Sequence, residues 1–317
     1  MTLTIRLARE TDAELADVAA FANTVSPEEP TSVEAMRWAD VTYPGGARWV
    51  AERHGRLVGL ATVGRIYMYA PDFDAYWATV QVASDARRSG IGSALLIETA
   101  AHARAAGKTH LHIPANEARP EGIAFLAHRG FTEYDRAKAV RLDLRGLAVP
   151  AVTVPDGIAL TTFAAAPNLV PGVHAVALEA FEDIPGGDRP MDVGDLAEFR
   201  ARDVDRAEIP ADAFAIATDE ADGSVVGYAA LSMVPGSETA ARHDMTAVRR
   251  ASRGRGIARA LKLTTIGWAI EHGLETLDTG NDVDNASMRA LNARLGYRPL
   301  PDELTMRGPV DGGIIAP

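Results

Sequence analysis

Residues 243–260, HDMTAVRRASRGRGIARA, combine a strand, a glycine-punctuated turn and the start of a helix. Polar and apolar residues alternate at the beginning of this stretch, and Gly254 and Gly256 interrupt the turn. A helical apolar pattern follows directly and continues to Ile266. Backbone N–H groups at such a turn approach phosphate oxygens closely, and the helix dipole favours the anion. The stretch is therefore a candidate pyrophosphate-binding turn.

Two better-known phosphate motifs do not fit this stretch. The Rossmann fingerprint needs three spaced glycines, and the Walker loop needs Gly-Lys-Ser/Thr; neither is present here. A Gly-Arg-Gly by itself also occurs in ordinary strand–helix turns. On this stretch alone, phosphate binding and a plain turn both remain open.

The same construction occurs twice in the chain. Six matched pairs are separated by a constant 166 positions, namely Val82 and Val248, Arg87 and Arg253, Gly90 and Gly256, Gly92 and Ala258, Gly130 and Gly296, and Phe131 and Tyr297. A constant offset across several elements indicates an internal duplication. We therefore expect two mixed α/β domains at residues 1–147 and 156–317, joined by a Pro-containing linker, with a strand at residues 140–144 closing the first.

Composition limits the class of function. The chain has 317 residues, 47% of them hydrophobic, a formal net charge of −11 and no cysteine. The lack of cysteine excludes disulfides, thiolate metal sites and a cysteine nucleophile. The acidic balance argues against nucleic-acid binding, and no apolar run is long enough to span a membrane. We expect a cytoplasmic protein with neither nucleic-acid nor membrane partners, and a monomer or homodimer.

The duplicated turn resembles the signature of the GNAT superfamily of acyl-CoA N-acyltransferases. That signature, Arg/Gln-x-x-Gly-x-Gly/Ala, stands here at residues 87–92 and again at residues 253–258. A following Asn-containing turn, helix and Gly-Phe/Tyr are fuller in the second copy, at residues 281–297. The arrangement is similar to the tandem GNAT proteins, of which the mycothiol synthases are one branch.

The resemblance implies two tandem α/β (α+β mixed) folds, each a twisted mixed sheet that splays between its fourth and fifth strands. Acetyl-CoA, the acyl-donor substrate, enters that gap, and no metal is expected. In the second copy it implies cofactor contacts at Val248, Arg253, Gly254, Arg255, Gly256, Ile257, Ala258, Asn281, Asn285 and Asn292. In the first copy the matching residues are Val82, Arg87, Arg88, Ser89, Gly90, Ile91 and Gly92. Capping is the alternative role for Asn285, and solvent exposure for Asn292.

Catalysis is expected in the second copy. Strand alternation places Arg242, Asp244 and Thr246 on one face with Val248, so Asp244 and Thr246 are the candidate catalytic residues. At an offset of 166, Ala78 matches Asp244 and offers no carboxylate. Asp244 would act as the base or anchor the substrate ammonium; its alternative role is pairing with Arg242, His243 or Arg189. The other face-matched residues of the first copy, Tyr76 and Val80, likewise suggest a catalytically degenerate unit, as do Ala115, Arg119 and Leu126 opposite the three asparagines.

One family position departs from the pattern. The usual Tyr proton donor is replaced by Leu126 in the first copy and Asn292 in the second. Water, Asn292 with a water, or a residue from elsewhere must then supply the proton, and Tyr297 and Tyr228 are candidates. Acceptor specificity is expected in the loop at residues 182–190, where Asp183 and Asp188 could hold a cationic amine; a solvated loop is the alternative.

Together these observations predict an acetyl-CoA-dependent N-acetyltransferase acting on a primary amine of a small molecule. Two alternatives stay open: a non-catalytic acyl-CoA-binding or regulatory protein, and a protein N-acetyltransferase. Whether the first copy binds acyl-CoA also stays open.

Overall fold

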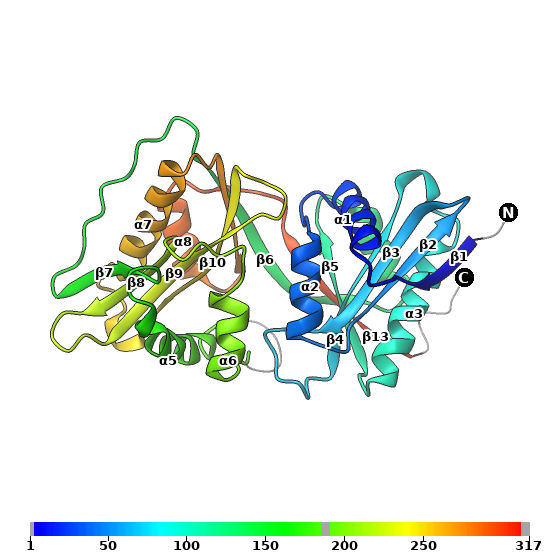
Figure 1. Ribbon diagram of the computed structural model, residues 1–317, viewed down its shortest axis with the longest axis horizontal. Helices are drawn as coiled ribbons and strands as arrows, with labels where there is room; N and C mark the ends of the chain where they lie inside the picture. The colour runs from blue at the N-terminus through cyan, green and yellow to red at the C-terminus, as the bar shows by residue number, and fades with distance from the viewer. Residues whose placement is uncertain (1–2, 185–190, 312–317) are drawn as a thin grey trace. The chain divides into compact units, whose positions relative to one another are not determined.

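The computed structural model describes residues 3–184 and 191–311 (Figure 1). The described chain forms a mixed α/β fold built as two compact units. One unit comprises Met1–Arg136 together with Pro301–Pro317, and the other comprises Ala137–Leu300. Below they are called unit 1 and unit 2.

Unit 1 is a sheet with helices on both faces. Its strands follow the order β1 (Leu3–Leu7), β2 (Ala47–Arg53), β3 (Arg56–Arg65), β4 (Ala75–Val82), β5 (His110–Asn116) and β13 (Glu303–Pro309). Only the β4–β5 neighbours run parallel in this sheet. Its helices are α1 (Asp12–Val25), α2 (Val33–Thr42), α3 (Ile91–Ala105) and α4 (Pro120–Ala127). Successive side chains of β2 point to opposite faces of the sheet, so Val50 packs with α1 and Ala51 packs with α3.

Unit 2 repeats this plan. Its strands follow the order β7 (Ile158–Thr162), β8 (Phe214–Asp219), β9 (Val225–Met233), β10 (Ala240–Val248), β11 (Thr276–Asp282) and β6 (Thr132–Asp143), with the short β12 (Arg298–Pro299) also on β6. Its helices are α5 (Val170–Phe181), α6 (Leu196–Phe199), a π-helical turn at Arg200–Val204, α7 (Ile257–Glu271) and α8 (Ala286–Arg294). One core cluster joins α5 to the sheet, and two others join α7 to it.

Each repeat gives its last strand to the other unit. β6 ends the first repeat, yet its residues from Ala137 onward pair antiparallel with β11 of unit 2. β13 ends the second repeat and pairs antiparallel with β5 of unit 1; in Figure 1 the red strand β13 lies beside β5. The compact units therefore differ from the contiguous domains 1–147 and 156–317 expected from the sequence. The strand expected at residues 140–144 exists, but it completes the second sheet.

Local sequence explains the helix starts. Thr11 and Ser32 cap α1 and α2, because their hydroxyl oxygens accept hydrogen bonds from the N–H groups of Glu14 and Ala35. Pro120 occupies the first turn of α4, where its missing N–H costs nothing.

No helix in the described residues is both long and apolar enough to cross a membrane.

Candidate acyl-transfer site

The two glycine-containing turns share one backbone geometry. In unit 2, Gly254 and Gly256 take positive φ angles of 77° and 90°, and α7 begins at Ile257. In unit 1, Arg88 and Gly90 take φ angles of 60° and 83°, and α3 begins at Ile91. Such left-handed residues before a helix N-terminus turn successive N–H groups inward, which makes a concavity suited to an anion.

The arginine that opens each turn fastens it to the preceding strand. Arg253 Nε donates to the carbonyl oxygen of Val248 at 3.0 Å, and Arg87 Nε donates to that of Val82 at 3.2 Å. The predicted residues 253–258 and 87–92 thus lie on one turn and helix start in each copy, while Asn281, Asn285 and Asn292 lie on β11 and α8. Their contact with acyl-CoA stays a prediction.

In unit 1, side chains of α4 cover the start of α3. The ring of Phe125 lies against Gly92, where an added Cβ would come within 3.3 Å of it. The guanidinium of Arg129 lies 3.8 Å from the Phe125 ring centroid and donates to Ser93 Oγ at 2.7 Å. Arg87 also pairs with Glu121 at 3.2 Å. The corresponding residues of unit 2 are Leu291, Leu295, Arg259 and Ser287, which cannot make these polar links.

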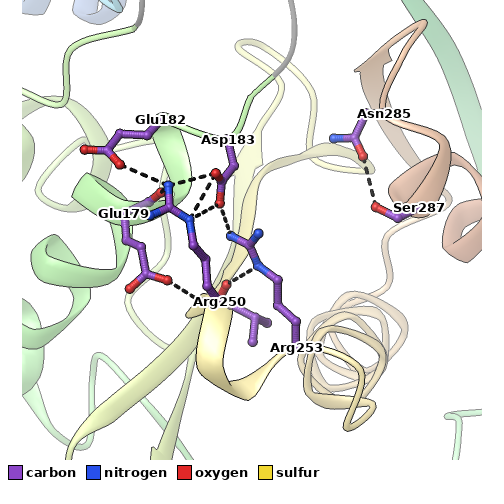
Figure 2. Close-up of polar contacts among 8 residues, drawn as sticks. Glu179, Glu182, Asp183, Arg250, Arg253, Asn285 and Ser287 are labelled. Carbon is purple, nitrogen blue, oxygen red and sulfur yellow. Dashed lines mark hydrogen bonds and ion pairs between the residues drawn. The ribbon is translucent and has the colours of Figure 1, made fainter.

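In unit 2, acidic residues at the end of α5 hold the arginines of the turn (Figure 2). Asp183 accepts hydrogen bonds from Arg250, the shortest at 2.7 Å, and pairs with Arg253 at 2.6 Å. Glu182 pairs with Arg250 at 3.0 Å, and the carboxylate of Glu179 accepts a hydrogen bond from the backbone N–H of Arg250. The Arg250 hydrogen bond, followed by that of Arg253, lowers the pKa of Asp183 to about 2. Asp183 is thus engaged with arginines, contrary to its expected availability for a cationic amine; Asp188 and Arg189 lie outside the described residues.

A β-bulge interrupts β10 at the candidate base. His243 pairs with Leu231 and Thr246 pairs with Ala229, so Asp244 and Met245 together face the single residue Ala230. Such a bulge leaves a residue unpaired and redirects side chains. β4 of unit 1 pairs with β3 without any register shift.

The bulge overturns two expectations about Asp244. Met245 and Ala247 pack in the core beneath α5, whereas Val248 packs with Leu261 of α7. Thr246 and Val248 therefore face α7 and do not share a face with Asp244. The second expectation is the match of Asp244 to Ala78. Upstream of the bulge, β10 and β4 are offset by 165 residues instead of 166, because Ala240 pairs with Thr276 just as Ala75 pairs with His110. The structural counterpart of Ala78 is thus His243 rather than Asp244.

The carboxylate of Asp244 is free. It is exposed to solvent, and it makes no hydrogen bond or ion pair with any residue in the described ranges. Desolvation by the surrounding protein nevertheless raises its pKa, against the opposing charges of Arg206, Arg202 and Arg242. Asp244 is thus open to solvent on one side and surrounded by protein on the others. The expected alternative, pairing with Arg242 or His243, is not what the structure shows.

A buried polar cluster lies on the α7 side of the same strand. His243 Nε2 lies 2.7 Å from Thr265 Oγ1, and His243 Nδ1 lies 2.6 Å from the hydroxyl of Tyr297. The ammonium group of Lys262 lies 5.4 Å from the centroid of the Tyr297 ring. Burial, followed by the charge of Lys262, holds the pKa of His243 well below its usual value. Sequence reasoning missed Lys262 and His243; the one available signal was a lysine at the helix position that Leu96 occupies in the first copy.

The three asparagines of unit 2 divide between capping and burial. Asn285 Oδ1 accepts from the N–H of Met288 at 3.2 Å and from Ser287 Oγ at 3.3 Å, so Asn285 caps α8 (Figure 2). Asn292 is 1% exposed and donates to Asn281 Oδ1 at 2.7 Å, which rules out its expected alternative as a solvated residue. Asn292 Oδ1 and Thr246 Oγ1 are buried and have no hydrogen-bond partner among the described residues. Their unmet hydrogen-bonding capacity suits a polar ligand.

Comparison with known proteins agrees with this geometry. The model of the Acetyltransferase (GNAT) family matches residues 14–131 and again residues 178–297. The chain belongs to this family. It is therefore an acyltransferase with two GNAT domains in tandem.

Three known proteins are similar to this chain along nearly its whole length. The mycothiol acetyltransferase of Nocardia farcinica (strain IFM 10152) is 28% identical over 309 residues, covering 94% of this chain and 95% of the relative. A tandem GNAT protein from the clavulanic acid biosynthesis pathway has a similar structure, with a TM-score of 0.75 at 22% identity, over 98% of this chain and 99% of that one. A GCN5-related N-acetyltransferase from Sphaerobacter thermophilus gives a TM-score of 0.73 at 16% identity, over 98% and 96%. The two structural matches support the fold.

Proposed function

We propose that unit 2 transfers acetyl from acetyl-CoA to a primary amine of a small molecule. The observation that carries this proposal is the unpaired carboxylate of Asp244, placed on the bulge of β10. β10 and β11 pair only from Ala240 to Arg242 and from Thr276 to Asp278, so the strands part at the residue before Asp244. The family binds its acyl donor at this parting.

In the proposed reaction, Asp244 acts as the base. Asp244 accepts a proton from the substrate ammonium, and the freed amine nitrogen attacks the thioester carbonyl directly. The carbon–sulfur bond then breaks, the acetylated nitrogen releases its second proton to solvent, and CoA leaves as a thiolate. The raised pKa of Asp244 makes its carboxylate a stronger base than an ordinary aspartate.

Two further observations support parts of the proposal. The turn at residues 253–258 begins with Arg253 and has two residues with left-handed φ before the helix, a combination that suits the pyrophosphate of CoA. The relative named as a mycothiol acetyltransferase favours a small acceptor over a protein.

The test is CoA release with acetyl-CoA and a panel of small amines, paired with calorimetry of acetyl-CoA binding. Asp244→Asn should lower CoA release by about 10²-fold or more while leaving acetyl-CoA affinity unchanged. Glu271→Gln, which removes an exposed carboxylate at the end of α7, is the control and should match the parent protein. Acetyl-CoA binding without release on any amine would replace this proposal with a non-catalytic acyl-CoA-binding protein.

A further inference from the structure

Lys262 is a buried lysine whose charge is not balanced by any described acidic residue. Its side chain lies in the second turn of α7 and is 1% exposed. It has no hydrogen bond from its ammonium group and no ion pair with any described residue. Burying an unpaired charge is costly, and folds retain such groups mainly where a ligand or a reaction uses them.

Within the part of the chain that the structure describes, no free carboxylate lies next to Lys262. His243 of β10 and Tyr297, which follows α8, are the titratable groups that pack against it. Asp278 of β11 acts on the same cluster, but both of its carboxylate oxygens bind Arg141 of β6, at 2.6 and 2.7 Å. Burial lowers the pKa of Lys262 to about 7, so near neutral pH the ammonium releases its proton readily.

The protons of the neighbouring groups are already committed. The hydroxyl of Thr265 donates to the carbonyl oxygen of Lys262 at 3.0 Å, so it can only accept from His243 Nε2. His243 is therefore the neutral Nε2–H tautomer, and its Nδ1 accepts the proton of the Tyr297 hydroxyl. The single hydroxyl proton of Tyr297 is therefore engaged in this hydrogen bond. Within the described cluster, Lys262 alone holds an acidic proton that no neighbour takes.

The position of this cluster ties it to the acyl donor. His243 is the first residue of β10 past its pairing with β11, on the face opposite Asp244. Thr246 Oγ1 faces the same side, and Asn292 Oδ1 lies on the helix beside β11; both are buried and unsatisfied. Asp244 and Lys262 therefore flank the parting of β10 and β11 from opposite sides.

We propose that Lys262 gives the proton to the CoA thiolate as it leaves, in the role that a tyrosine fills in the family pattern. This rests on the proposed acetyl transfer. As the carbon–sulfur bond breaks, its electron pair stays on sulfur, and a proton passes from the Lys262 ammonium to form the thiol. Lys262 becomes a neutral amine, and solvent returns its proton after product release. Asp244 takes the amine proton on the other face, so the two protons are handled separately.

A comparison of leaving groups tests the assignment. Lys262→Leu places in α7 the residue that unit 1 carries at the matching Leu96, so the substitution suits this helix position. Lys262→Arg keeps the positive charge but cannot release its proton near neutral pH. Each variant is assayed with acetyl-CoA and with the acetyl thioester of 4-nitrothiophenol, whose acidic thiol leaves without protonation.

Both variants should lower kcat with acetyl-CoA by about 10²-fold and lose the fall in rate that the parent shows as pH rises through about 7. Both should stay within a few-fold of the parent with the aryl thioester. Near-parental activity of Lys262→Arg with acetyl-CoA would assign Lys262 an electrostatic role and overturn proton donation. An equal loss with both donors, with reduced thermal stability or acetyl-CoA binding, would make the lysine structural and also overturn it. If the parent itself releases no CoA with any amine, the proposed function fails and the assignment falls with it.

Discussion

The hydroxyl of Tyr297 donates a 2.6 Å hydrogen bond to Nδ1 of His243, which connects the segment after α8 to the last residue of β10 before its bulge. The corresponding residues of unit 1 are Phe131 and Ala78, and neither can make this bond. The bulge is absent from β4 as well. The hydrogen bond and the bulge thus occur together, in the unit that carries the candidate base.

Removing the hydroxyl should destabilise unit 2. Tyr297→Phe leaves the buried Nδ1 of His243 without a donor, which costs about 1–3 kcal/mol of unfolding free energy. Chemical denaturation measures the change, and a double-mutant cycle with His243→Ala isolates the pair. Additive effects of the two substitutions would show that the bond contributes nothing.

Lys262→Leu should stabilise the protein in a pH-dependent way. The folded-state pKa of about 7 lies below the ordinary 10.5, so the unfolded chain binds more protons between these values. The penalty of the buried ammonium is complete below about pH 7 and is relieved by roughly 1.4 kcal/mol per pH unit as pH rises toward 10.5. Unfolding free energies of parent and variant should differ most at pH 6 and converge in alkaline solution. A difference that does not vary with pH would contradict the buried charge.

The acid side of the pH–rate profile should report Asp244. Desolvation raises its pKa above the usual 3.8, so kcat/KM should fall as pH drops through a value higher than that of an ordinary aspartate. Asp244→Asn should remove this limb along with most of the rate. A limb that persists in the slow variant would assign the proton acceptor to another group.

Asp183→Asn should strengthen acyl-CoA binding by unit 2. The carboxylate now occupies Arg250 and Arg253, and CoA phosphates must compete with it for those arginines. Because all three side chains are partly exposed, the gain should be modest, about two- to five-fold in Kd. Calorimetry with acetyl-CoA measures it, and the gain should shrink as salt is raised. Weaker binding would show that Asp183 positions the arginines instead of competing for them.

Unit 1 should not bind acetyl-CoA in its present form. Phe125 and Arg129 cover the start of α3 beside Gly92, so calorimetry should count one site per chain. The double variant Phe125→Ala, Arg129→Ala should add a second, weaker site, while the same substitution of Leu291, the unit 2 counterpart of Phe125, adds none. Two sites in the parent protein would show that these side chains move aside readily.

Local and repeated features were predictable from the sequence. The turn at residues 253–258 and its duplicate depend on short-range backbone preferences, so the duplication followed from spacing, and the two GNAT folds followed from the resemblance of the repeated motif to the family signature. Capping by Asn285 was also foreseen as an alternative, since an asparagine before a helix commonly accepts from the third residue on.

The remaining features depend on pairing and burial, which spacing does not reveal. The bulge in β10 adds one residue without changing the local composition, and it moved Thr246 to the face opposite Asp244. The destination of β6 was hidden because β6 and β13 are equivalent in their repeats and suit either sheet edge. Lys262 appeared on the sequence as one charged residue in an amphipathic helix, and only its burial marks it.

The exchange of β6 and β13 constrains how the chain is made. The sheet of unit 1 is completed by Glu303–Pro309, so a ribosome that has finished the first repeat still holds a sheet with an open edge on β5. That edge stays uncovered until nearly the whole chain has emerged, whereas unit 2 finds its last strand already synthesised. Cutting the chain in the linker would likewise leave each fragment without the strand that completes its sheet in the whole chain.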